Sequence, residues 1–419
     1  MIAVRVALRA LGGNKLRTTL TMLGIIVGVA AVIALTAVGK GAQAQITAQI
    51  ESMGKNLLFV RPGSTTSGTI QGGAGSSPTL SLDDADAVRR LPGVGAVAPE
   101  TGGQVQLVAN GTNYSTFVRG VTADYASVRN ARTAAGSWIT AQQVDERSSV
   151  IVLGSTVARK LFGSTDPVGQ TLRATAGNHA GTVLRVVGVT EAKGAGGLGD
   201  QDDLVFMPLT TVQSQLQARR TPGGEIAVAT INVQVASERQ MAEVMAQIGV
   251  LLRTRHQVTR DDFTVQSQQE ILRSIAQVSG TFTLLLGAVA SISLFVGGVG
   301  IMNTMLITVR ERTREIGIRK AVGARRLDIL LQFLTESTVV SVLGGCVGIT
   351  CGVGIALAVG RLGMSGLLPI PGGERIAPLV GVDSVAVAFA VSAAVGLFFG
   401  VYPALHAARL QPTDALRAE

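Results

Sequence analysis

The sequence predicts a membrane protein with four transmembrane α-helices and a large mixed α/β extracytoplasmic domain, inserted between helices 1 and 2 on a two-helix stalk. Three observations lead to this fold class. The 419 residues are 47% apolar and only 15% charged, which is too apolar for an ordinary soluble protein. Four apolar stretches reach the length of about 20 helical residues that crosses a bilayer. Between the first and the second stretch, strand and helix patterns alternate.

The four apolar segments fall at residues 18–39, 280–308, 329–360 and 380–402. The excess of basic residues lies beside these segments, whereas residues 41–278 carry 20 Lys and Arg against 19 Asp and Glu. The net charge of +9 therefore sets the membrane topology and does not indicate a nucleic-acid patch.

The positive-inside rule assigns each connecting segment to one side of the membrane. Residues 1–17 form a cytoplasmic N-terminus, residues 309–328 a cytoplasmic loop and residues 403–419 a cytoplasmic tail. The domain with its stalk, residues 40–278, and the loop at residues 361–379 lie outside the cell membrane. We expect a multi-pass protein of the cytoplasmic (inner or plasma) membrane with both termini in the cytoplasm.

The first apolar segment also has features of a cleaved signal peptide. It has a basic flank, and the small residues Ala42 and Ala44 follow it. Its apolar part is long for a signal peptide and runs into further helix-compatible sequence. We therefore expect an uncleaved membrane anchor.

Helical spacing continues beyond the bilayer at both ends of the domain. Two apolar stripes recur at i, i+4 and i+7: Ile46, Ile50 and Met53 on the first helix, and Ile271, Ile275 and Val278 on the second. Ser267 and Glu270 form a capping box that starts the second helix. Residues 268–306 would extend about 58 Å, roughly twice the hydrocarbon core. We expect the stripes to pack as a two-helix stalk; plain helix extension is the other interpretation, and both can hold.

Within the domain, strand patterns alternate with helix patterns. We expect strands at residues 150–153, 183–189 and 231–235, and helices after Ser81, over residues 156–162 and after Ser237. The last helix carries an apolar stripe: Met241, Val244, Met245, Ile248, Leu251 and Leu252. Asp83 and Asp84 fall in the first turn after Ser81, where carboxylates usually compensate the helix dipole. Residues 63–78 lack periodicity and are expected to form a mobile loop.

The sequence predicts a short charged helix in the loop between the second and third apolar segments. Over residues 309–330 it carries seven basic and three acidic residues, with Glu315 four positions before Arg319 and Gly323 placed to end the helix. Ile316, Ile318 and Val322 are too many apolar side chains for so small an element to cover, which suggests a protein partner. From charge alone, an ordinary positive-inside loop is the more common explanation.

The third apolar segment contains small and polar residues with structural meaning. Gly344, Gly348 and Gly352 repeat the G-x-x-x-G spacing, which permits close helix approach within the chain or at a dimer contact. Glu336 is an intramembrane carboxylate, which is either functional or paired with Arg325 or Arg326. Cys346 and Cys351 share this helix as small packing residues.

Residue patterns for catalysis are missing. The sequence has no phosphate-binding loop with its lysine, no lipase-type nucleophile motif and no histidine or cysteine pair at metal-ligand spacing. Asp200, Asp202 and Asp203 are more consistent with a surface loop than with a calcium site. We therefore expect no catalytic, cofactor-binding or metal residues and no ATP hydrolysis by the chain itself.

With these features, the sequence resembles the permease subunits of the MacB/FtsX class of ABC transporters. The resemblance covers nearly the whole chain and is strongest over residues 297–337, GGVGIMNTMLITVRERTREIGIRKAVGARRLDILLQFLTES. In the domain it is carried by SLDDADAVRRLPGVGAVAPE, GSTVARKLFGSTDPVGQTLR and GDQDDLVFMPLTTVQ. The charged helix is then similar to the family's coupling helix, which docks onto an ATPase.

The resemblance implies partners and a mechanism. It implies a homodimer or heterodimer of permeases with two ATPase subunits that hold ATP and Mg²⁺, and motion passed up the stalk to the outer domains. Family members with a fused ATPase carry it on the same chain, so here a separate ABC ATPase subunit is expected. The residues implied in docking are Arg310, Glu311, Arg312, Arg314, Glu315, Ile316, Gly317, Ile318, Arg319, Lys320 and Gly323.

The implied activity is efflux or release of a hydrophobic antibiotic, peptide or lipid-linked substrate. A lipoprotein-releasing permease and a regulator of cell-wall hydrolases are the alternatives. The regulators have smaller outer domains, which disfavours them here. The substrate and the presence of an extracytoplasmic adaptor stay open at this stage.

Overall fold

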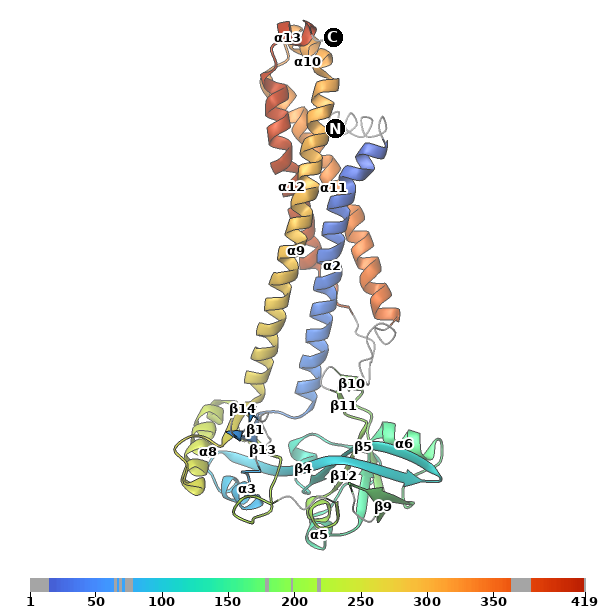
Figure 1. The fold of residues 1–419 in the computed structure, drawn as a ribbon, viewed down its shortest axis with the longest axis vertical. Coiled ribbons are helices and arrows are strands. Elements are labelled where there is room, and N and C mark those ends of the chain that lie inside the picture. The colour runs from blue at the N-terminus through green and yellow to red at the C-terminus, as the bar shows by residue number, and fades with distance from the viewer. Residues whose placement is uncertain are drawn as a thin grey trace. The chain divides into compact units, whose positions relative to one another are not determined.

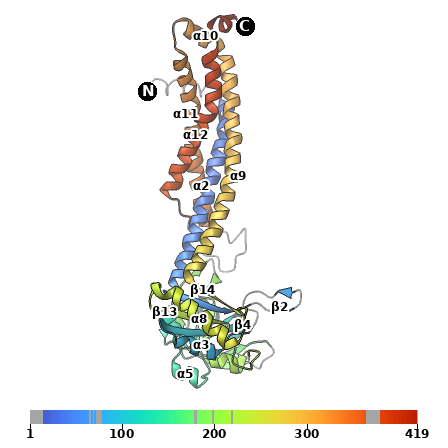
Figure 2. The same cartoon turned by 90° about the vertical axis from the view of Figure 1, so that its left-hand side faces the viewer.

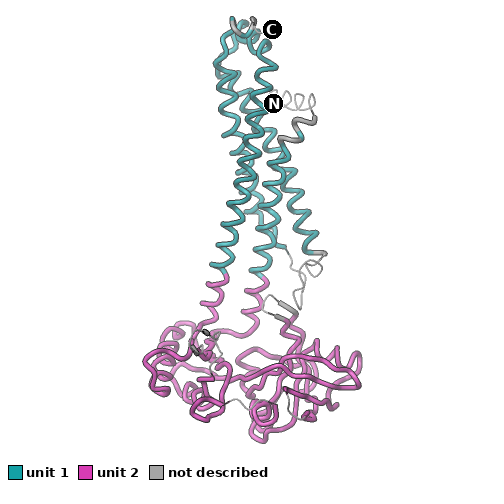
Figure 3. Tube along the Cα trace, viewed as in Figure 1, with its two compact units in different colours: residues 1–44, 276–370, 375–419 teal, residues 45–275, 371–374 magenta. Residues whose placement is uncertain are grey.

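The computed structural model describes residues 15–417 except 64–65, 68–69, 72–77, 178–180, 197–198, 217–219 and 363–377. The chain divides into two compact units (Figure 3). The membrane unit combines Met1–Ala44 with Ala276–Ile370 and Arg375–Glu419, and the inserted domain consists of Gln45–Ile275 with Pro371–Glu374.

Four long apolar helices make up the membrane unit: α2 (Lys15–Ser52), α9 (Gln268–Glu311), α11 (Arg326–Leu362) and α12 (Val382–Arg409). Each contains a stretch long and apolar enough to cross a membrane, with a mean hydropathy of at least 2.2. Figures 1 and 2 show these helices side by side. The four predicted transmembrane helices are therefore confirmed. Most of the predicted loop at residues 361–379 lies outside the described residues.

The helices extend past the predicted bilayer segments because nothing in the sequence ends them there. α2 continues through Ser52 and α9 begins at Gln268, so both reach into the inserted domain. At the other end, α12 continues to Arg409 with Pro403 inside it, and a short helix, α13 (Pro412–Arg417), follows. The C-terminal segment that the sequence suggested only as a tail is thus helical.

The G-x-x-x-G stripe of α11 packs against α2 within the same chain. A Cβ atom on Gly348 would lie 2.9 Å from both the Ile26 carbonyl oxygen and the Val29 Cβ, and one on Gly352 would lie 2.8 Å from the Ala30 carbonyl oxygen. Only glycine allows so close an approach of the two helices.

The inserted domain is built on one mixed ten-stranded sheet in the described part of the chain, with the order β14-β1-β13-β4-β5-β12-β7-β9-β6 and β8 beside β4 and β9. The strands are β1 (Leu57–Pro62), β4 (Val94–Ala109), β5 (Thr112–Val121), β6 (Thr133–Gly136), β7 (Val150–Leu153), β8 (Thr171–Thr175), β9 (Thr182–Thr190), β12 (Leu204–Pro208), β13 (Thr230–Val235) and β14 (Phe263–Ser267). The β5–β12 and β7–β9 pairs are parallel, and the other pairs are antiparallel. Two small hairpins join β2 (Thr66–Ser67) to β3 (Ile70–Gln71) and β10 (Ala195–Gly196) to β11 (Gly199–Asp200).

Helices cover the sheet in two places. They are α3 (Leu82–Arg89), α4 (Tyr125–Val128), α5 (Ala141–Asp145), α6 (Ser155–Phe162), α7 (Leu209–Thr211), a π-helical turn at Val212–Leu216, a 3₁₀ turn at Glu238–Gln240 and α8 (Met241–His256). Figure 1 shows α3 and α8 at one end of the sheet and α6 at the other. Each end has its own apolar core, one including Val88, Val233 and Ile248, the other Ile151 and Leu161.

The local sequence patterns of the domain agree with these elements. β7, β9 and β13 occupy the expected strand positions, and α3 follows Ser81 in a full capping box with Asp84. In α8 the expected stripe is buried at Met241, Val244, Ile248 and Leu252. The predicted mobile loop at residues 63–78 lies mostly outside the described residues.

Candidate coupling site

The charged loop of the membrane unit folds as α10 (Thr313–Ala321), which directly follows α9. Glu315 Oε1 and Arg319 Nη2 form the expected i,i+4 ion pair at 2.5 Å. Gly323 has a φ of +107°, a conformation that favours glycine, and the amide of Ala324 donates to the Arg319 carbonyl, 3.0 Å away. The predicted short, glycine-ended helix is therefore present.

One face of α10 is fixed to the membrane unit. Ile316 is 2% exposed, and a Cβ on Gly317 would lie 2.7 Å from the Ala415 Cβ of α13. Lys320 Nζ donates to the carbonyl oxygens of Ala408 and Leu410, at 2.6 and 2.8 Å. These carbonyls close α12, where a cation is favourable. Burial and the neighbouring Arg326 lower the pKa of Lys320.

Two arginines connect this helix region to α11. Arg312, between α9 and α10, pairs through Nη1 with Glu336 Oε2 at 3.4 Å, and Glu336 is only 8% exposed. Arg319 Nη1 donates to Gln332 Oε1 at 2.7 Å. Of the two alternatives for Glu336, the pairing with Arg325 or Arg326 was therefore wrong. Those two residues precede or begin α11, whereas the α9–α10 junction brings Arg312 beside the third turn of that helix.

The opposite face of α10 carries exposed apolar and basic side chains. Arg314, Ile318 and Val322 follow one another at i, i+4 and i+8 and so lie along one side of the helix. Ile318 is 50% exposed and Val322 84%, and Leu327, at the start of α11, is 65% exposed. We call Arg314, Ile318, Val322, Arg325, Arg326 and Leu327 the docking face.

The structure sorts the residues implied in docking into two groups. Ile316, Gly317 and Lys320 hold α10 in place, together with Arg312 and Arg319, while Gly323 ends the helix. Arg310, Glu311, Arg314, Glu315 and Ile318 are exposed. Sequence reasoning already named Val322 with Ile318 as an apolar side chain for a partner, but it did not single out Leu327, which is 65% exposed.

At the stalk, paired strands hold the helix roots together. α2 leads into β1 and β14 leads into α9, and these strands pair with Leu58 opposite Ser267. Gln268 Nε2 donates to the Ile50 carbonyl oxygen at 2.6 Å, and Ser267 and Glu270 form the expected capping box.

The expected packing of stripe against stripe is wrong in its detail. Val278 is 56% exposed, and Ile271 packs against the core that contains Leu57 and Phe59. Ile50 and Ile275 line a cavity, as do Met53 and Ile271. Ile46 is half-buried. The helical spacing was read correctly, but the sheet beneath the helices determines what each stripe contacts.

Comparison with known proteins connects both parts of the chain to one family. The MacB-like periplasmic core domain family matches residues 18–251, and the FtsX-like permease C-terminal family matches residues 287–412, which include α10. The chain belongs to the MacB/FtsX-type ABC permeases.

Individual relatives of this permease are similar along its whole length. The macrolide export ATP-binding/permease protein MacB of Bdellovibrio bacteriovorus is 39% identical over 98% of this chain and 61% of that protein. The protein of the same name from Rhodospirillum rubrum is 42% identical over 100% of this chain and 60% of that protein. The permease thus spans about three fifths of these relatives. The crystal structure of the periplasmic region of MacB from Actinobacillus actinomycetemcomitans aligns with a TM-score of 0.42 and 21% identity, covering 54% of this chain and 95% of that one.

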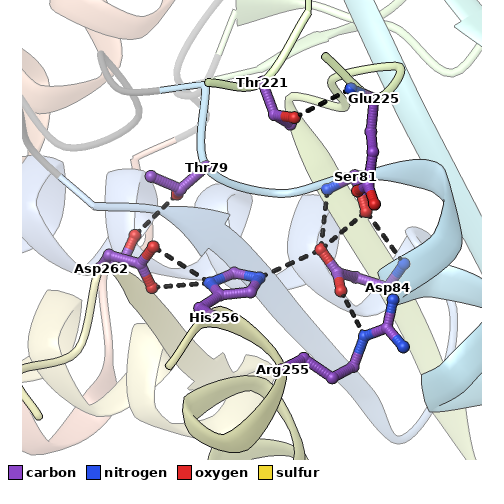
Figure 4. A network of polar contacts seen from close by, with 8 residues as sticks. All are labelled: Thr79, Ser81, Asp84, Thr221, Glu225, Arg255, His256 and Asp262. Carbon is purple, nitrogen blue, oxygen red and sulfur yellow. Dashed lines mark hydrogen bonds and ion pairs between the residues drawn. The ribbon is translucent and has the colours of Figure 1, made fainter. Parts of the chain in front are cut away.

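The inserted domain of the permease holds an ion network around the buried carboxylate of Asp84, which sequence reasoning missed. Figure 4 shows the His256 imidazole between two carboxylates. Its Nδ1 lies 2.8 Å from Asp262 Oδ1 and its Nε2 lies 3.1 Å from Asp84 Oδ2. Arg255 Nε donates to Asp84 Oδ1 at 2.7 Å, and the Ser81 amide donates to Asp84 Oδ2 at 2.9 Å. Asp84 thus joins α3 to α8, a larger role than the dipole compensation expected of it.

The network shifts the pKa values of its members in opposite directions. Burial alone would lower the pKa of His256, but hydrogen bonds with Asp262 and Asp84 raise it above its ordinary 6.5. Burial alone would raise the pKa of Asp84, but hydrogen bonds from Arg255, Ser81 and His256 lower it below its ordinary 3.8. Charged His256 therefore stabilises the fold fully below pH 6.5, and this stabilisation is lost as the pH rises through the folded-state pKa. The contribution of Asp84 is present above pH 3.8 and is lost as the pH falls through its folded-state pKa.

A pH dependence of stability follows for the domain. Its urea unfolding midpoint, followed by the fluorescence of Trp138, is expected to fall as the pH rises above 6.5 and His256 loses its proton. His256→Gln should flatten this dependence, whereas His406→Gln, at a histidine of the membrane unit, should keep the wild-type slope. An unchanged slope in His256→Gln would contradict the assignment.

Other polar groups have structural roles. The Asp202 carboxylate accepts from the amides of Lys193 and Gly194, at 2.8 and 2.9 Å. Asp202 is only 5% exposed, so for this residue the expected surface loop was wrong. Among the described residues, no group of three or more His, Cys, Asp or Glu is placed to hold a metal ion. Cys346 and Cys351 are free thiols.

Proposed function

We propose that this permease couples ATP hydrolysis by a separate ABC ATPase subunit to movement of the inserted domain. ATP and Mg²⁺ would be held by the ATPase. The observation that carries the proposal is the docking face, on which Ile318 and Val322 are 50% and 84% exposed on a helix of nine residues. An exposed apolar strip with basic neighbours suits a groove that is apolar at its centre and acidic at its rim.

The contacts behind the docking face support transmission of force. Lys320 ties α10 to the end of α12, and Arg312 ties the α9–α10 junction to Glu336 of α11. A displacement of α10 would therefore be felt by three membrane helices together. α9 is continuous over 44 residues, about 66 Å of helix, and its first turns belong to the inserted domain.

We extend the proposal to topology, assembly and substrate. The basic loops favour a cytoplasmic position for α10 and both termini, in the inner or plasma membrane, which leaves the inserted domain outside. Two copies of the permease would act with two ATPase subunits. The relatives named as macrolide exporters support a hydrophobic antibiotic, or a peptide or lipid-linked molecule, as the substrate.

The proposal predicts that the double variant Ile318→Asp/Val322→Asp no longer binds the ATPase subunit. Two carboxylates in the docking face would have to be desolvated against an apolar groove, so capture of a co-expressed ABC ATPase should fall at least about tenfold. Both side chains are exposed, so the permease itself should fold normally. The measurements are co-purification and the ATPase rate of the purified complex.

The matched control is Val183→Asp/Val250→Asp, which changes two exposed valines of the inserted domain, 55% and 60% exposed. This control should keep the ATPase bound. If the Ile318→Asp/Val322→Asp variant captures as much ATPase as the control, the docking assignment is wrong.

A further inference from the structure

Two cavities in the inserted domain share three lining residues, two of which are arginines. The larger, of about 500 Å³, lies among the last turn of α2, the first turns of α9 and the sheet, and the smaller has about 220 Å³. Met53, Arg119 and Arg129 line both. Every residue that lines either cavity belongs to the inserted domain.

Arg129 is a partly buried cation that lacks a counter-ion among the described residues. Its guanidinium carbon lies 5.3 Å from the centre of the Phe59 ring, and Nη2 reaches the weak acceptor Sδ of Met53 at 3.5 Å. Nη1 is buried and makes no hydrogen bond. Arg119 differs, because its Nη1 contacts Glu100 at 3.2 Å and the Tyr125 hydroxyl at 3.3 Å. A buried guanidinium donor without an acceptor is costly, and an anion in the cavity would relieve that cost.

Five carboxylates line the two cavities, Glu100, Glu191, Asp200, Asp202 and Glu270, and the structure shows no ion pair between any of them and Arg129. Three of the five are committed to other groups. Glu100 pairs with Arg119, Glu270 caps α9 by accepting from the Ser267 amide, and Asp202 accepts from two backbone amides. Further cations line the cavities, namely Arg61, Arg119, Arg132 and Lys193. Lys193 lies close to Arg129, with Nζ 3.4 Å from the Arg129 carbonyl oxygen. Burial, and next the charge of Arg129, lower the pKa of Lys193, as expected where cations gather.

The larger cavity has apolar as well as polar lining residues. The apolar ones are Ile50, Met53, Phe59, Ile271 and Ile275. We propose that this cavity binds an amphipathic anion, with the phosphate or carboxylate group on Arg129 and the apolar part along Phe59 and the isoleucines. The arginine fork matches both acidic groups. The site is independent of ATPase docking, and a ligand in it would contact the roots of α2 and α9 at once.

Trp138 is a built-in reporter for this site. It is the only tryptophan of the chain, and its ring centre lies 6.1 Å from that of Tyr125 and 5.1 Å from that of Phe206. Both of these rings line the smaller cavity. The full chain in phosphatidylcholine nanodiscs can therefore be titrated with octyl phosphate while Trp138 fluorescence is recorded.

The proposal predicts a saturable fluorescence change with octyl phosphate. Inorganic phosphate, which lacks the chain, and octylammonium, which reverses the charge, should each bind at least about tenfold more weakly. Arg129→Gln should weaken octyl phosphate binding about tenfold or more, the loss typical of a charge-assisted hydrogen bond. Arg129→Lys, which keeps the positive charge, should bind octyl phosphate more tightly than Arg129→Gln and less tightly than the wild type. Arg159→Gln, at an exposed arginine of α6 away from both cavities, is the matched control and should bind as the wild type does.

The ligand comparison on the wild-type chain needs no variant, so it stands even if a substitution impairs folding. Equal responses to octyl phosphate and octylammonium, or equal affinity of Arg129→Gln and Arg159→Gln, would overturn the proposal, as would inorganic phosphate binding as tightly as octyl phosphate. Adding phosphatidic acid to the nanodiscs distinguishes two kinds of natural ligand. If phosphatidic acid competes with octyl phosphate, the ligand is a membrane lipid. If it does not compete, the ligand is a soluble anion.

Discussion

Replacing Gly348 with valine is expected to separate α11 from α2 and to lower the thermal unfolding midpoint of the membrane unit by about 5 °C or more. A Cβ at this position would lie 2.9 Å from the Ile26 carbonyl oxygen, and backbone cannot move aside as a flexible side chain can. Overpacking of this kind typically costs about 1–3 kcal/mol. The measurement is thermal unfolding of the purified chain in a neutral detergent.

The control lies on the same helix. A Cβ on Gly354 would meet nothing within 4 Å, so Gly354→Val tests the effect of valine on α11 without the collision. Its unfolding midpoint should stay near that of the wild type. If both variants lose the same stability, helix propensity or membrane insertion is responsible and the close contact with α2 is not.

Replacing Asp84 with alanine is expected to cost the inserted domain about 3 kcal/mol, the usual penalty for breaking a buried ion pair from one side. Asp84 is 3% exposed and accepts from Ser81, Arg255 and His256. Without it, the two cationic side chains lose a shared partner and α3 loses its capping box. Urea unfolding followed by Trp138 fluorescence measures the change.

Asp83→Ala is the matched comparison for Asp84→Ala. Asp83 is the adjacent carboxylate in the first turn of α3, it is exposed, and its removal should cost only a few tenths of a kcal/mol through the helix dipole. Equal destabilisation by the two substitutions would show that the helix terminus matters and the buried network does not.

The sequence is informative wherever the physics is local. Hydrophobic length identified the four membrane helices, and i,i+3 or i,i+4 spacing identified the Glu315–Arg319 pair and the Ser267–Glu270 capping box. In each case the partners share one helix or one turn, so helical geometry alone brings them together. The glycine that ends α10 belongs to the same class, because a single φ angle decides its role.

Partners far apart in the sequence could not be predicted in this way. Asp84 and Arg255 are 171 residues apart, and only the packing of α3 beside α8 makes them neighbours. For Glu336 the sequence offered only nearby arginines as partners, because a sequence does not show which other helix end approaches it. Arg129 attracted no attention as an isolated basic residue. Its significance depends on the two cavities that it lines and on a guanidinium that forms no ion pair with the described residues.

The pairing of β1 with β14 has a consequence for how such permeases diversify. Residues at paired positions of adjacent antiparallel strands have Cα atoms about 5 Å apart, so the chain enters and leaves the inserted domain at almost the same point. A module with adjoining ends can be lengthened, reshaped or exchanged for another without altering the distance between the helices that carry it. The inserted domain can therefore change while α2, α9 and the distance between them stay the same.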